Sequence, residues 1–170
     1  VIAGYDLEDP DFKAAPVTVY ETFFKNSSED SNNDGLQDGS IRVYRNRDNI
    51  NLYCLMEGRD ASAEDEIVID RMHADNSRIR VGDVITVGNA QFTVVGLVAY
   101  ANYSTLYENN TDTMFDALTF DVGMTTAEGY ARLSAPDHYA YAWRYPAEPE
   151  DEVAEKHLSD SFLKALMTQA

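Results

Sequence analysis

Cysteine is almost absent from this chain of 170 residues: Cys54 is the only one, so an internal disulfide bond cannot form. The count excludes a disulfide-stapled scaffold but neither requires nor excludes a location outside the cytoplasm. Cys54 lies in the apolar stretch 52–56. We therefore expect a buried, inert thiol rather than a nucleophile.

Basic residues are also scarce. The chain has 13 Lys and Arg against 30 Asp and Glu, which gives a formal net charge of -17. Binding to nucleic acid depends on clusters of basic side chains that neutralise phosphates, so this function is not expected. Anionic lipid headgroups are repelled for the same reason. We interpret the acidic charge as the means by which an exposed domain stays soluble.

No apolar run is long enough to cross a bilayer, since the most apolar stretch covers only residues 92–101. No signal peptide is recognisable either. The chain begins at Val1 without an initiator Met, which suits an excised fragment as well as a mature protein.

Motifs of catalysis are missing as well. The sequence has no Gly-x-Ser-x-Gly nucleophile elbow and no P-loop, so we nominate no catalytic residue and expect neither an enzyme nor ATP binding by this chain. The histidines are His73, His138 and His157, and none belongs to a recognisable cluster of ligands. We expect them at the surface or its rim, and a zinc site has little support.

What is present is an ordinary globular composition, with 44% hydrophobic and 25% charged residues. The length suits one domain over 1–170, with room for two lobes. Alternating apolar residues from Ile79 to Val87, a Gly88-Asn89 turn and a second alternating run to Val98 predict a hairpin. We place the β-rich lobe around residues 50–100.

A second hairpin is predicted from arms at 16–24 and 41–45, joined by a polar loop over 26–40. Further strands are expected at 50–56, 66–69, 120–124 and 139–145. Asp70 is expected to cap a short helix that runs toward Asn76. Thr125 and Glu128 form a capping-box pattern, which predicts a second helix over about 126–133. Leu158, Phe162 and Leu166 mark one face of a C-terminal helix. These elements together predict an α+β fold.

The most specific motif is the acidic loop, defined here as residues 30–38. Its alternate oxygen side chains could converge on calcium, and Gly35 allows a sharp turn between them. The twelfth position of an EF-hand loop would be Ile41 instead of glutamate, so this is not an EF-hand. The alternatives are a shorter calcium loop and a solvated polar hairpin tip. The ligands of a calcium loop would be Asp30, Asn32, Asp34, Asp38 and the Leu36 carbonyl.

An aromatic series follows near the C-terminus. Tyr139, Tyr141, Trp143 and Tyr145 share one parity, so an extended segment places them on one face. An exposed face of this kind could bind a partner, because Tyr and Trp dominate binding hot spots. The alternative, which we favour, is a strand that buries its aromatic face on the core.

A longer pattern has Val81-Gly82-Asp83-Val84-Ile85 at its centre, followed by Phe92-Thr93-Val94-Val95-Gly96. This pattern resembles the MacB-like periplasmic core domain of FtsX-type ABC transporter permeases. The preceding segments, in order, are 56–59, 65–70, 74–76 and 79–80. The segments 103–106 and 115–117 look like the Gram-positive branch of such permeases.

The resemblance implies a fold with a mixed α/β lobe and a smaller β-rich lobe. It also implies a domain inserted between two transmembrane helices, with Val1 and Ala170 near the membrane, on the extracytoplasmic face of a bacterial, Gram-positive cell. Its implied partners are the permease's own transmembrane helices, a second permease copy, a separate cytoplasmic ATPase subunit that alone binds ATP, and an unknown external substrate or protein.

Two functions from different classes follow. The first is an ectodomain that couples ATP-driven transmembrane motion to an external substrate or partner protein, with no cofactor required. The alternative is a free-standing secreted binding module stabilised by Ca²⁺. An extracellular hydrolase is a third hypothesis, and it requires a pocket of convergent titratable groups.

Overall fold

The computed structural model describes residues 17–103, 107–108, 113 and 116–169. The expected positions of Val1 and Ala170 lie outside this range. The chain divides into two compact units, considered separately below. The smaller unit comprises the described residues 17–22 and 139–169, and the barrel unit comprises Phe23–His138.

The smaller unit is a two-stranded ribbon with a helix packed on it. Strand β1 (Thr18–Glu21) pairs antiparallel with β9 (Tyr141–Arg144), and α4 (Glu152–Gln169) follows. The predicted helical face is confirmed, because Phe162 is fully buried at its centre. The side chains packed around Phe162 and Ala165 are Val17, Val19, Trp143 and Leu166.

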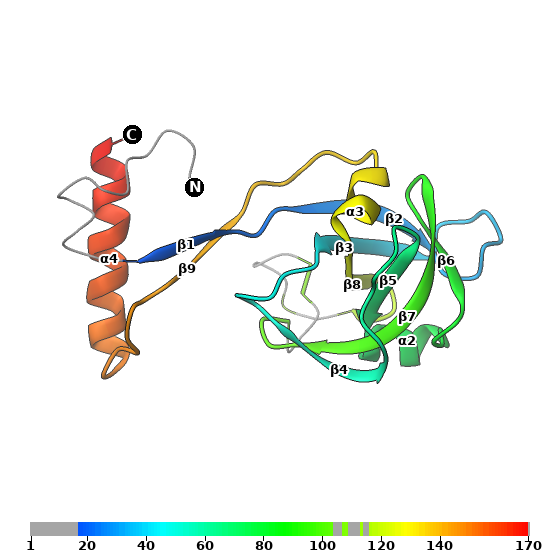
Figure 1. Cartoon of the computed structure of the whole chain (residues 1–170), viewed down its shortest axis with the longest axis horizontal. Coiled ribbons are helices and arrows are strands. Elements are labelled where there is room, and N and C mark those ends of the chain that lie inside the picture. The colour runs from blue at the N-terminus through cyan, green and yellow to red at the C-terminus, as the bar shows by residue number, and fades with distance from the viewer. Residues whose placement is uncertain (1–16, 104–106, 109–112, 114–115, 170) are drawn as a thin grey trace. The chain divides into compact units, whose positions relative to one another are not determined.

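The barrel unit is built on one seven-stranded sheet (Figure 1). Its strands follow the order β4-β7-β5-β8-β3-β2-β6, and an additional pairing between β6 and β7 closes all of them except β4 into a barrel. With helices α2 and α3 included, the α+β prediction is confirmed. The strands are β2 (Phe24–Asp30), β3 (Gly39–Arg45), β4 (Tyr53–Gly58), β5 (Glu66–Asp70), β6 (Val84–Val87), β7 (Ala90–Tyr100) and β8 (Phe120–Thr125).

The predicted hairpin is confirmed as β6 and β7, in the register Val87↔Ala90, but β6 begins five residues later than expected. Arg78 and Gly82 both have positive φ, which interrupts the extended backbone between them. Ile79 is nevertheless buried. Ile79 is therefore apolar because it packs in the core, although it does not belong to the strand.

The other predicted hairpin is wrong in its first arm. Residues 18–21 form β1 and pair with β9, more than a hundred residues away, so local pattern could not reveal the pairing. The true hairpin joins β2 and β3, which stay paired as far as Glu29↔Gly39. The loop between them therefore covers only residues 31–38.

Both short helices have side-chain caps. For α2 (Arg71–Ser77), Asp70 accepts hydrogen bonds from the backbone N–H groups of Met72 and His73, as predicted. For α3 (Ala127–Arg132), Thr126 is the cap rather than Thr125, because the Thr125 hydroxyl donates to the Glu66 carbonyl. The C-terminal helix expected from Leu158, Phe162 and Leu166 is α4, which begins directly after Asp151.

The expectation that Cys54 is buried is wrong: its side chain is exposed. Strand β4 pairs with β7 but lies outside the closed barrel, so the apolar residues of this strand face solvent. Met56, for example, is 52% exposed. Among the described helices, none combines the length and the apolar character needed to cross a membrane.

Candidate functional site

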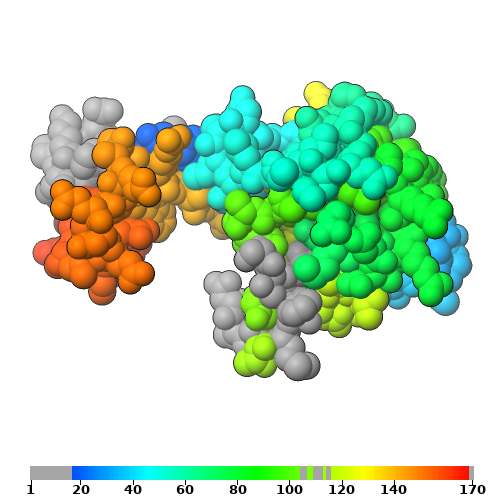
Figure 2. All heavy atoms as spheres, turned by 90° about the horizontal axis from the view of Figure 1, so that it is seen from below, coloured from blue at the N-terminus to red at the C-terminus, as the bar shows by residue number. Residues whose placement is uncertain are grey.

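A polar cleft of about 650 Å³ lies on the barrel unit beside the acidic loop. One wall is the loop itself, and the opposite wall is the end of α2 and the segment that follows it. Figure 2 shows the loop, in light blue, at the surface next to green segments of the same unit. The residues that line these walls include Ser31, Asn33, Asp38, Arg78 and Asp83, and Leu118 lines the cleft from the segment before β8.

The oxygen atoms of the acidic loop hold the loop's own backbone. The Asp30 carboxylate accepts hydrogen bonds from the N–H groups of Asp34, at 3.2 Å, and of Gly35, at 2.9 Å. Asn32 Oδ1 accepts another from Asp34, and Asp38 Oδ2 accepts one from the Ser31 N–H. Such bonds are typical of Asx turns, so they give the loop a defined shape without a metal ion.

The predicted calcium ligands are thus neighbours in one loop. Among the described residues, one group of three His, Cys, Asp or Glu side chains has its ligand atoms within 4.8 Å of one another, and the loop carboxylates are not part of it. Calcium binding by Asp30, Asn32, Asp34, Leu36 and Asp38 stays a prediction.

Millimolar Ca²⁺ is expected to raise the melting temperature of the chain, because an ion that binds only the folded state stabilises it. The measurement is a thermal melt followed by circular dichroism, with and without Ca²⁺. Asp30→Asn should remove the shift. An unchanged melting temperature of the unmodified chain at millimolar Ca²⁺ would rule out a stabilising calcium loop.

The group that does converge lies beneath the cleft, and we call Glu29, His73 and Asp121 the buried triad. They come from β2, α2 and β8, and their exposed fractions are 0%, 1% and 0%. His73 Nε2 lies 3.0 Å from Glu29 Oε1, and His73 Nδ1 lies 3.0 Å from the carbonyl oxygen of Ala117. Three titratable groups from distant parts of the sequence therefore meet inside the barrel unit.

Asp121 joins the end of β5 to β8. Its Oδ1 accepts hydrogen bonds from the backbone N–H groups of Val122, at 2.7 Å, and Asp70, at 3.2 Å. Asp70 in turn caps α2, which carries His73. The same backbone bonds therefore position both the carboxylate and the helix that bears the imidazole.

Burial and neighbouring charges act in opposite directions on the pKa of His73 and on that of Asp121. Burial acts to lower the pKa of His73, but the charges of Asp121 and Glu29 outweigh it and raise this pKa to about 9. Burial raises the pKa of Asp121 well above its ordinary range, although the His73 charge opposes the rise. A metal-free triad at neutral pH therefore holds a protonated imidazole.

Sequence reasoning missed this triad, and the expectation that the histidines lie at the surface or its rim is wrong for His73. Its helix has Asp70 at the cap and exposed neighbours such as Arg71, so local pattern gave no sign of burial. In an alternating strand, Asp121 lies on the face opposite to Phe120 and Val122, which usually meets solvent. Every residue of β8 is buried instead, because β8 is a central strand paired at both edges and its other face packs in the apolar core.

The aromatic series is partly used inside the smaller unit. Trp143 packs against Phe162 with ring centroids 5.2 Å apart, and its Nε1 donates to the Tyr145 hydroxyl. Tyr141 and Tyr145 are half-buried, whereas Tyr139 is 72% exposed. The face is thus neither fully buried nor fully open. Partner binding by Tyr139, Tyr141, Trp143 and Tyr145 stays a prediction.

The two segments of Gram-positive resemblance lie mostly outside the described residues. Tyr103 is described, and its hydroxyl lies 2.7 Å from that of Tyr44 and accepts a hydrogen bond from Arg42. Asp116 and Ala117 are described as well, and the Ala117 carbonyl belongs to the surroundings of the triad.

Comparison with known proteins finds similarity to solved structures alone. No protein-family model and no curated protein matches the chain. Among solved structures, the chain is similar in fold to the periplasmic region of MacB from Actinobacillus actinomycetemcomitans, with 14% sequence identity and a TM-score of 0.49. The match covers 88% of this chain and 66% of that chain, so this chain spans just under two thirds of the MacB region's length.

Proposed function

We propose that this chain is the extracytoplasmic domain of an ABC transporter permease, which passes movement of membrane helices to a substrate or partner protein outside. The carrying observation is the ribbon of β1 and β9. Thr18 pairs with Arg144 and Glu21 with Tyr141, so the incoming and outgoing strands run side by side. A domain whose first and last strands pair in this way can be inserted into a longer chain at a single place, as a domain between two membrane helices must be.

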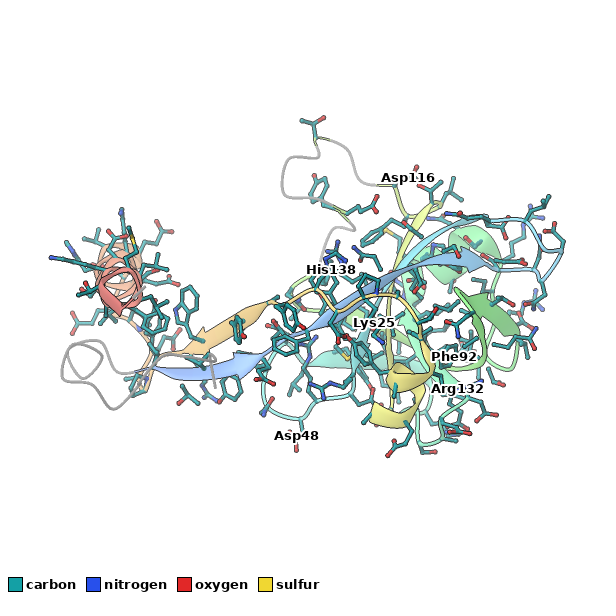
Figure 3. The ribbon with its side chains drawn as sticks, turned by 90° about the horizontal axis from the view of Figure 1, so that it is seen from above. Lys25, Asp48, Phe92, Asp116, Arg132 and His138 are labelled. Atoms are coloured by element: carbon teal, nitrogen blue, oxygen red, sulfur yellow. The ribbon has the colours of Figure 1, made fainter. Side chains whose placement is uncertain are left out.

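Each unit holds its incoming and outgoing strands together with its own backbone hydrogen bonds. In the smaller unit, the Thr22 N–H donates to the Ala140 carbonyl at 2.8 Å. In the barrel unit, Phe24 and His138, the latter labelled in Figure 3, exchange two backbone hydrogen bonds.

The sequence pattern supports the same proposal. Its segments form consecutive parts of the barrel unit, namely β5, the helix α2, and the hairpin of β6 and β7. The proposed partners are the permease's membrane helices, a second permease copy and a cytoplasmic ATPase. On this proposal the domain lies on the outer face of a bacterial, Gram-positive membrane, and ATP is bound elsewhere.

Cys54 offers a direct test of location, since it is exposed and is the only cysteine of the chain. A membrane-impermeant maleimide added to intact cells is expected to label the full-length protein in the membrane fraction. Cys54→Ser should remove the label from this domain. Labelling that appears only after lysis would contradict the proposal, and a labelled protein in the medium would favour the secreted binding module.

The parent gene gives a second test. It is expected to encode an apolar span of about 20 residues on each side of this segment, the length needed to cross a bilayer as a helix. A gene without these spans would contradict the proposal, because the domain would then have no membrane helices at its two ends.

A further inference from the structure

We propose that the buried triad of Glu29, His73 and Asp121 is a binding site for one divalent transition-metal ion, of which zinc is the representative. This inference is independent of the proposed function. It rests on the orientation of the imidazole, on the separation of the ligand atoms and on unpartnered carboxylate oxygens.

The imidazole orientation is fixed by a backbone carbonyl. The Ala117 oxygen, 3.0 Å from His73 Nδ1, can only accept, so Nδ1 carries a proton and donates it. Nε2 then faces Glu29 Oε1, 3.0 Å away, and a contact this short requires either a proton on Nε2 or a cation between the two atoms. When an ion is bound, the ring is neutral and Nε2 directs its lone pair at the ion. Ligand histidines in proteins commonly donate their other N–H to a carbonyl in this way.

The separation suits a shared ion. Zinc lies about 2.0–2.2 Å from nitrogen and oxygen ligands. Two such ligands on one ion can therefore be 3.0 Å apart, as Nε2 and Oε1 are. One ligand atom from each member of the triad lies within 4.8 Å of the others. A nitrogen and two carboxylates form a donor set that zinc and its neighbours accept.

Two carboxylate oxygens of the triad are unsatisfied. Glu29 Oε2 and Asp121 Oδ2 are buried and have no hydrogen-bond partner among the described residues. An unpaired buried carboxylate oxygen is costly, so such atoms in a native protein need an explanation. A cation held by the triad supplies the missing partner to both side chains.

The polar cleft provides a route to the triad. Ser31 lines the cleft, and its hydroxyl donates to Glu29 Oε1 at 3.1 Å. Leu118 also lines it and directly follows Ala117. The triad is therefore one layer of residues below the cleft surface. The Ser31 hydroxyl would orient the glutamate from outside the ligand set.

The test begins with the 170-residue chain freed of metal by a chelator and then titrated with zinc. We expect one equivalent to bind, measured by elemental analysis after gel filtration, and the melting temperature to rise with zinc. Glu29→Gln should weaken binding by at least about tenfold, and Ser31→Ala, which removes only the supporting hydroxyl, by about tenfold. Glu155→Gln and His157→Gln, both at exposed positions of α4, are the matched controls and should bind as the unmodified chain does.

Substoichiometric zinc on the folded, unmodified chain would overturn the proposal and leave an imidazolium–carboxylate pair. Undiminished binding by a folded Glu29→Gln variant would also overturn it, because the ion would then lie elsewhere. The Ser31→Ala variant keeps the test informative if substitution within the triad prevents folding, since Ser31 is at the surface of the cleft. Full affinity in that variant would contradict the route and the supporting contact.

Discussion

Replacing Phe162 with alanine is expected to unfold the smaller unit while the barrel unit stays folded. Phe162 is fully buried, and the cluster around it is small. Removal of a buried phenylalanine side chain costs about 3–5 kcal/mol, because the transfer energy is lost and a cavity remains. A ribbon of two strands and one helix has little other apolar burial with which to offset that cost.

Trp143 is a built-in reporter for this experiment, since it is the only tryptophan of the chain and packs on Phe162. The variant should show a solvent-exposed tryptophan emission spectrum and reduced helical circular dichroism. Amide hydrogen exchange in β5, β7 and β8 should remain slow. Leu163→Ala is the matched control, because Leu163 is the next residue of α4 and is 42% exposed. Loss of both units together would show that they are not independently stable.

The second large effect is expected from Gly96→Ala in β7. A Cβ atom at Gly96 would lie 2.4 Å from the backbone oxygen of Arg59, with further close contacts to Leu55 and Val68. Gly96 is paired with Gly58, which itself has a φ of 77°. Backbone cannot move aside as a flexible side chain can. The substitution must therefore push β4 away from β7.

We expect Gly96→Ala to lower the free energy of unfolding by about 3 kcal/mol, at the upper end of the cost of overpacking. The corresponding fall in melting temperature is roughly 10 °C for a unit of this size. Urea unfolding and hydrogen exchange of the β4 amides are the measurements. Ala99→Ser, at an exposed position of the same strand, should change neither. A melting temperature equal to that of the unmodified chain would contradict the predicted clash.

Features that depend on residues close together in the sequence were predicted, and features that depend on residues far apart were not. The hairpin of β6 and β7 and the Asp70 cap depend on neighbouring residues, and both were predicted. The pairing of Thr18 with Arg144 depends on contacts across the whole chain. The pairing of Glu29 in β2 with Val87 in β6 also joins distant parts of the sequence, and the barrel cannot close without it, so the closed barrel had no local signal.

The same reason explains the site. The acidic loop was recognised because its oxygen side chains are close together in the sequence. The triad was not, since Glu29 and His73 are 44 residues apart and Asp121 is further along. A single polar residue in an apolar run, such as Asp121, usually indicates a solvent-facing position in a strand. Burial on both faces of β8 reverses that interpretation.

The exchange of hydrogen bonds between Phe24 and His138 has a practical consequence for protein engineering. It brings the two ends of the barrel unit within one backbone contact of each other. Domains whose termini are adjacent tolerate transplantation and circular permutation. The Phe23–His138 segment is therefore suited to transfer into another protein, where it would replace the turn of a hairpin. A short turn that joins its two ends would allow circular permutation of the segment.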